Sequence, residues 1–153
     1  MGAAYFYHLT RRPLEDTLSM LLAKSMQAGW RVAVRGPNVE RLAWLDEKLW
    51  LGPEEGFLPH GLAGGAHDAL QPVLLTQGPA GNDPQCVMAI DGAEIGADEL
   101  TGLERACVLF DGNDAQALDV ARGQWKTLKE SGVSAQYWSE DSGRWEMKAQ
   151  TGA

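Results

Sequence analysis

The chain has 153 residues, 44% of them hydrophobic and 22% charged, and its 21 acidic and 13 basic side chains give a net charge of −8. At this length one core can bury most of the surface that the unfolded chain exposes, so we expect a single domain that needs no disulfide or metal for stability. The negative charge disfavours nonspecific duplex binding, because that affinity depends largely on Lys and Arg side chains at phosphates.

Cysteine usage and hydropathy indicate where the protein works. The two cysteines, Cys86 and Cys107, are too few for a disulfide framework, and such sparse usage points to a reducing compartment. No stretch approaches the run of about 20 apolar residues that a membrane helix requires, and 1–8 has no basic region followed by an apolar run. We therefore expect a cytoplasmic protein without a membrane contact.

Strands and helices alternate along the first third of the chain. Alternating aromatic residues predict a strand over 4–9, and apolar residues at helical spacing predict a helix over 14–26. Gly29 stands where a helix commonly ends in the left-handed conformation. A second strand is predicted over 31–35, and a second helix over 39–50.

The remainder of the chain continues this alternation. Short apolar runs predict strands over 73–76, 86–90, 105–110 and 134–139, and a third long helix is predicted over 114–131. Strands that alternate with helices favour an α/β sandwich with a mainly parallel sheet. We expect one domain over 1–148 and a frayed tail, rich in Gly and Ala at its tip, over 149–153.

Sequence signatures of catalysis and of nucleotide binding are absent. The first predicted strand runs into Thr10-Arg11-Arg12-Pro13 and not into a G-x-G-x-x-G turn, and Gly61–Gly65 lacks the Gly-Lys-Ser/Thr of a phosphate loop. Cys86 and Cys107 fall inside predicted strands and are expected to be buried structural thiols. The histidines are dispersed without metal-ligand spacing, so we expect neither metal nor cofactor.

The third long helix carries a candidate binding site. At 100° per residue, Leu118, Ala121, Trp125 and Leu128 form one stripe, and Arg122, Lys126 and Lys129 form an adjoining basic edge. A basic edge beside an aromatic side chain suits a peptide that ends in apolar residues and a free carboxylate. Spacing alone favours a core tryptophan with a solvated basic flank, because most aromatic stripes on helices are buried.

A second candidate follows the middle helix, in a connection rich in Gly and Pro. It contains Trp50, Leu51, Phe57, Leu58, Pro59 and His60. These apolar side chains could cap the edge of the sheet or form a protein-interaction patch, since aromatic anchors concentrate binding energy. The alternative function is that of a small cytoplasmic enzyme with a site around His60 and Gly61–Gly65.

Three segments of the chain resemble the chi subunit of bacterial DNA polymerase III, a small accessory protein of the clamp loader. The first is Phe6-Tyr7-His8-Leu9, and the last is Ala121-Arg122-Gly123-Gln124-Trp125-Lys126. The middle and most specific one comprises Leu45-Asp46-Glu47-Lys48-Leu49-Trp50 and Phe57-Leu58-Pro59-His60-Gly61-Leu62-Ala63-Gly64. The resemblance implies a Rossmann-like three-layer fold without nucleotide chemistry and a noncatalytic role as a bridge between proteins.

The resemblance also implies partners and sites. Arg122, Trp125 and Lys126 would bind the acidic C-terminal tail of single-stranded DNA-binding protein, and helical spacing adds Lys129 to them. A separate surface with Trp50 and Phe57, beside Pro59 and His60, would bind the psi subunit or a helicase-like protein. Single-stranded DNA would be reached only indirectly. Family members commonly carry a tyrosine where Trp125 stands.

Overall fold

The computed structural model describes residues 3–10, 14–50, 61–62, 72–77, 82, 84–140 and 145–151, without the side chains of Leu49 and Trp50. The strands are β1 (Ala3–Leu9), β2 (Val32–Arg35), β3 (Gly61–Leu62), β4 (Val73–Thr76), β5 (Cys86–Ala89), β6 (Arg105–Asp111), β7 (Ala135–Ser139) and β8 (Glu146–Thr151). The helices are α1 (Leu14–Gln27), α2 (Val39–Trp50), α3 (Ala97–Leu100) and α4 (Ala115–Glu130).

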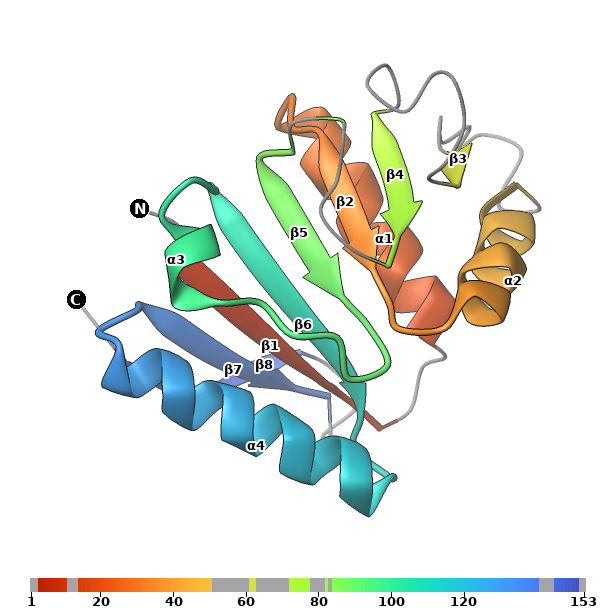
Figure 1. Cartoon of the computed structure of the whole chain (residues 1–153). Coiled ribbons are helices and arrows are strands. Elements are labelled where there is room, and N and C mark those ends of the chain that lie inside the picture. Colours follow the sequence, from red (N-terminus) through yellow and green to blue (C-terminus); the bar gives the residue numbers. More distant parts are fainter. Residues whose placement is uncertain are drawn as a thin grey trace.

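The strands form one eight-stranded sheet in the order β3-β4-β2-β5-β6-β1-β7-β8. Every neighbouring pair is parallel except β7 and β8, which are antiparallel. Helices α1 and α2 cover one face of the sheet, and α4 crosses the other (Figure 1). The predicted fold class, a mainly parallel sheet flanked by helices in three layers, is confirmed. None of the described helices combines the length and the apolarity that a bilayer crossing requires.

Two apolar clusters fill the spaces between the layers. Because successive side chains of a strand point to opposite faces, Tyr7 joins the cluster under α1 and α2, whereas Phe6 joins the cluster under α4. Leu22 of α1 and Leu128 of α4 are fully buried in their respective clusters. The two cysteines are free, buried thiols on β5 and β6, as their positions in apolar strand patterns predicted.

The structure differs from the sequence prediction at three short elements, of which the two-residue strand β3 lies in the predicted connection rich in Gly and Pro. Helix α3 has four residues, which is too short to produce a helical period, and it lies in a connection that the sequence marks only as acidic. Strand β8, which the sequence did not predict, includes Ala149–Thr151. Thr151 pairs with Ala135 of β7, and this pairing orders a segment whose exposed residues show no buried alternation.

Candidate protein-binding site

Helix α4 is fixed at both ends by local hydrogen bonds. The carboxylate of Asp114 accepts hydrogen bonds from the backbone N–H groups of Gln116 and Ala117, which would otherwise lack partners in the first turn. At the other end Gly132 takes φ +78°, and the Val133 N–H donates to the carbonyl of Leu128. The helix therefore presents its side chains from a defined position across β6, β1 and β7.

Trp125 lies at the boundary between the core and the surface. Its half-buried indole meets Phe6 of β1 edge to face, with ring centroids 5.4 Å apart. It meets Tyr137 of β7 in the same way at 6.0 Å. These contacts are typical aromatic geometry and hold the indole against the sheet. The indole is only partly buried, so Trp125 both packs against the sheet and exposes part of its ring at the surface.

Three cations border this indole on one flank of α4. From Trp125, Arg122 and Lys129 are rotated by about 60° and 40° around the helix and Lys126 by about 100°, all in the same direction. All three are exposed. Within the described part of the chain, none of their side chains forms a hydrogen bond or an ion pair. We call these cations together with Trp125 the α4 rim.

Two residues that the sequence did not single out for this site extend the α4 rim toward β7. The Tyr137 hydroxyl and Nδ1 of His8 share a hydrogen bond of 2.8 Å, and the imidazole also stacks on Phe110 at 5.3 Å. Gly112 packs so closely that a Cβ there would lie 1.8 Å from the imidazole. Tyr137 lies two residues after the buried Ala135 on β7, so both side chains point to the face of the sheet under α4. This alternation is the sequence signal for its position.

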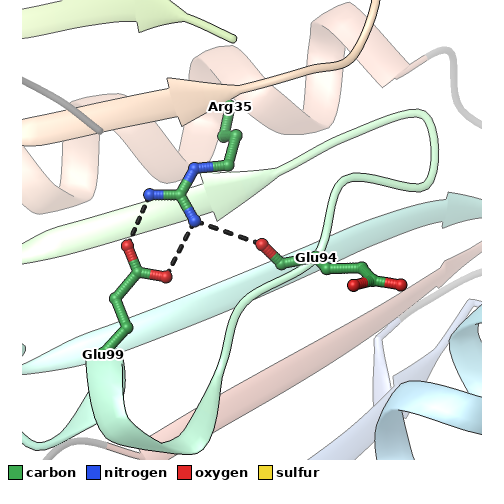
Figure 2. A network of polar contacts seen from close by, with 3 residues as sticks. All are labelled: Arg35, Glu94 and Glu99. Carbon is green, nitrogen blue, oxygen red and sulfur yellow. Dashed lines mark hydrogen bonds and ion pairs between the residues drawn. The ribbon is translucent and has the colours of Figure 1, made fainter. Parts of the chain in front are cut away.

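Two arginines outside α4, Arg35 and Arg41, have carboxylate partners. Arg35, at the end of β2, donates to both carboxylate oxygens of Glu99 at 2.8 and 2.5 Å and to the carbonyl of Glu94 (Figure 2). The hydrogen bonds from the guanidinium hold the pKa of Glu99 below its usual range. Arg41 of α2 pairs with Asp91 at 3.2 Å. These pairs tie the connection between β5 and β6 to β2 and to α2, and they leave little charge on Arg35 and Arg41 for a ligand.

A cleft of about 760 Å³ opens at the carboxyl ends of β1 and β6. In parallel α/β folds this edge is the usual place for a ligand. Among the residues that the structure describes, its charged lining consists of Arg41, which is already paired, and of Asp91, Asp111 and Asp114. An excess of carboxylates disfavours phosphate, and Asp114 occupies the N–H groups that begin α4. The cleft lies on the flank of α4 opposite the cations, where Gln124 donates to the carbonyl of Ala93.

Most of the second predicted surface lies outside the described residues. Helix α2 reaches Trp50, but the side chain of Trp50 and all of Phe57, Pro59 and His60 are not described. Of the alternative enzyme site, His60 and most of the Gly61–Gly65 loop are likewise outside, and the described Gly61 and Leu62 form β3. Within the described ranges, no group of three His, Cys, Asp or Glu side chains gathers as metal ligands would.

Comparison with known proteins identifies a family. The family model described as DNA polymerase III chi subunit, HolC, matches residues 1–136. This match covers most of the chain, including α4 and the start of β7. Strand β8 lies beyond it. No curated protein sequence matches the chain.

Proposed function

Since the chain belongs to the family of DNA polymerase III chi subunits, we propose that it is a noncatalytic adaptor in replication. It links the clamp loader of the polymerase to single-stranded DNA-binding protein by holding the acidic C-terminal tail of that protein. The observation that carries this proposal is the α4 rim, where three exposed cations without partners among the described residues border a half-buried indole.

The chemistry of the α4 rim fits an acidic polypeptide end. Arg122 can present two parallel N–H groups to a terminal carboxylate, and Lys126 adds a second cation beside it. The apolar side chains that precede the carboxylate would pack on Trp125 and Tyr137, whose rings already meet edge to face. Lys129, one turn further along, would meet acidic residues upstream in the tail. Contact with single-stranded DNA is then indirect.

We assign the second partner to the surface around Trp50, Phe57, Pro59 and His60. This partner is the psi subunit or a helicase-like protein. The support is that the family match includes this segment and that the segment carries two large aromatic residues. The segment begins where α2 ends and returns to the sheet at β3, so both of its ends are held.

The tail site is tested with a fluorescent peptide that ends in Asp-Phe-Pro-Phe, titrated with the protein at low salt. We expect saturable binding, and Arg122→Ala should weaken it by about 1.5 to 3 kcal/mol, the value of a charge-assisted hydrogen bond. Lys24→Ala is the matched control, because it removes one exposed cation from α1 and should leave affinity unchanged. Amidation of the peptide terminus should weaken binding as Arg122→Ala does.

His60→Ala separates the adaptor from the alternative function, a small enzyme with a site around His60 and Gly61–Gly65. His60→Ala should leave tail binding intact if the protein is an adaptor. Absence of binding at low salt, or equal losses from Lys24→Ala and Arg122→Ala, would contradict the tail site.

The second surface is tested separately. Trp50→Ala and Phe57→Ala should abolish copurification of the psi subunit or of a helicase-like protein while the tail peptide still binds. If either variant unfolds instead, that side chain belongs to the core and the assignment of the surface is wrong.

A further inference from the structure

Arg105 lies against two aromatic rings at the end of the sheet where its parallel strands begin. The guanidinium carbon of Arg105 lies 4.3 Å from the ring centroid of Tyr5 and 5.2 Å from that of Trp30. All three residues are half-buried. Tyr5 and Trp30 pack on the apolar cluster under α1 and α2, so this group lies on the face of the sheet opposite α4. We call these three residues the Arg105 clamp.

Local backbone structure places each member of the Arg105 clamp. Helix α1 ends with Gly29 at φ +80°, and the Trp30 N–H donates to the carbonyl of Ser25 at 3.0 Å. This C-terminal cap fixes the point at which Trp30 leaves the helix. Arg105 begins β6, where its N–H donates to the carbonyl of Gln85, and its register partner on β1 is Ala3. The clamp is therefore built on ordered elements.

The guanidinium of Arg105 has unused donors. Among the residues that the structure describes, it forms neither a hydrogen bond nor an ion pair, and it lies against the two rings. Arg35 and Arg41, by comparison, each donate to a carboxylate. A guanidinium carries five N–H donors, and a cation–π contact with a ring does not give any of them a hydrogen-bond acceptor of the usual kind.

We propose that the Arg105 clamp is a docking site for an internal acidic segment of a partner polypeptide, with an Asp or Glu carboxylate on Arg105 and adjacent apolar side chains against Tyr5 and Trp30. Tryptophan, tyrosine and arginine are the residue types that dominate binding energy at protein interfaces. The rings hold the guanidinium in place before the partner arrives, so little side-chain freedom is lost on binding. This site is separate from the α4 rim and adds a partner to the proposed adaptor.

A carboxylate is a better match here than a nucleic acid. A single strand presents one phosphate per nucleotide and needs a row of cations along its path. The described surface near the clamp offers Arg31, which already donates to the carbonyl of Asn82. One planar cation beside two rings matches one carboxylate flanked by apolar groups.

The test follows the Nε–Hε signal of Arg105 by nuclear magnetic resonance during titration. The probe is the blocked peptide acetyl-Gly-Leu-Asp-Leu-Gly-amide, which has no free terminal carboxylate, and the matched probe carries Asn in place of Asp. We expect a saturable shift with the Asp peptide and an affinity at least about fivefold lower with the Asn peptide, because a charge-assisted hydrogen bond is lost. Arg105→Gln should remove the binding, whereas Arg122→Gln should leave it unchanged.

The same experiment can overturn the proposal. Equal binding of the two peptides, or a loss in Arg122→Gln but not in Arg105→Gln, would show that the clamp does not take the carboxylate. Binding of hexathymidylate through Arg105 without binding of the Asp peptide would assign the site to nucleic acid. If Arg105→Gln does not fold, Arg105→Lys keeps the charge without the planar donors and should lower affinity about threefold. Unchanged affinity in that variant would also overturn the proposal.

Discussion

Arg35 and Arg122 occupy opposite situations in the same molecule. The Arg35 side chain is 12% exposed, and three hydrogen bonds tie it to Glu99 and to the carbonyl of Glu94. Arg122 is exposed on α4 and, within the described residues, has no partner. A buried cation must be matched by carboxylate or carbonyl oxygens, or its lost hydration destabilises the fold. An exposed cation has no such requirement, so its charge is available to a partner.

This contrast separates stability from binding. The donors of Arg35 hold the connection that contains α3 against the end of β2 (Figure 2). The donors of the α4 rim hold nothing within the described chain, and their removal should leave the fold intact. Substitution of Arg35 should therefore lower the free energy of unfolding, whereas substitution of a cation of the α4 rim should lower the affinity for the tail peptide.

The largest effect is expected from Arg35→Ala. It leaves the Glu99 carboxylate and the Glu94 carbonyl without their donor, and we expect the free energy of unfolding to fall by about 3 kcal/mol, near the lower end for a broken buried pair. Glu99 is 35% exposed, so water can take over part of the contact. Urea denaturation measures this loss, and the affinity for the tail peptide should stay the same.

Arg122→Ala is the matched variant, and it should lower the affinity for the tail peptide without lowering stability. Its free energy of unfolding should change by less than about 0.5 kcal/mol, as is usual for an exposed residue without partners. A comparable loss of stability in both variants would mean that Arg122 also holds the fold, and the contrast would fail.

Gly112→Ala should produce the next largest effect, and it should lower both the free energy of unfolding and the affinity for the tail peptide. A Cβ at this position would lie 1.8 Å from the imidazole of His8, so the ring must move and its hydrogen bond with Tyr137 must break. We expect a loss of about 2 kcal/mol in unfolding free energy, typical of overpacking, with weaker tail binding because Tyr137 supports Trp125. Thermal denaturation and peptide titration measure the two effects.

A second glycine provides the control for that substitution. Gly123 lies on the exposed side of α4, and a Cβ there would meet nothing within 4 Å. Gly123→Ala should stabilise the protein by up to about 1 kcal/mol through helix propensity. If Gly112→Ala were equally harmless, His8 would not be packed as described.

Most of the fold could be predicted from the sequence, because its elements carry strong local patterns. The sequence predicted the apolar period of α1 and the left-handed conformation of Gly29, and both are confirmed. Strand β8 could not be predicted in this way. Its order depends on pairing with β7, which is a contact between segments and not a property of its own residues.

The candidate sites were predictable to different degrees. The basic edge of α4 follows from helical spacing, so Arg122, Lys126 and Lys129 could be placed together in advance. The Arg105 clamp could not, since its three members are distant in the sequence and meet only when β1 and β6 pair beside the end of α1. The same reason hid His8 and Tyr137, which lie on separate strands.

Lowering the pH should weaken the ion pair between Arg35 and Glu99. Hydrogen bonds from Arg35 lower the pKa of Glu99 in the folded state, so this residue stabilises the fold fully above the ordinary glutamate value, near 4.3. That contribution is lost as the pH falls through the lowered pKa. Glu99→Gln should cost about 1 kcal/mol at pH 7, after allowance for solvent screening, and much less at pH 3. A difference that is constant between these pH values would contradict this account.

Trp125→Tyr should have the smallest effect and shows how the two roles of this residue divide. A phenol retains an aromatic wall but buries less apolar area than an indole, so its contacts with Phe6 and Tyr137 should be reduced. We expect tail affinity to fall about threefold, or ~0.7 kcal/mol, which is well below the effect of Arg122→Ala. The salt dependence of binding should not change, because the cations of the α4 rim are untouched. A larger loss than that of Arg122→Ala would make the indole, and not the charge, the principal determinant of tail binding.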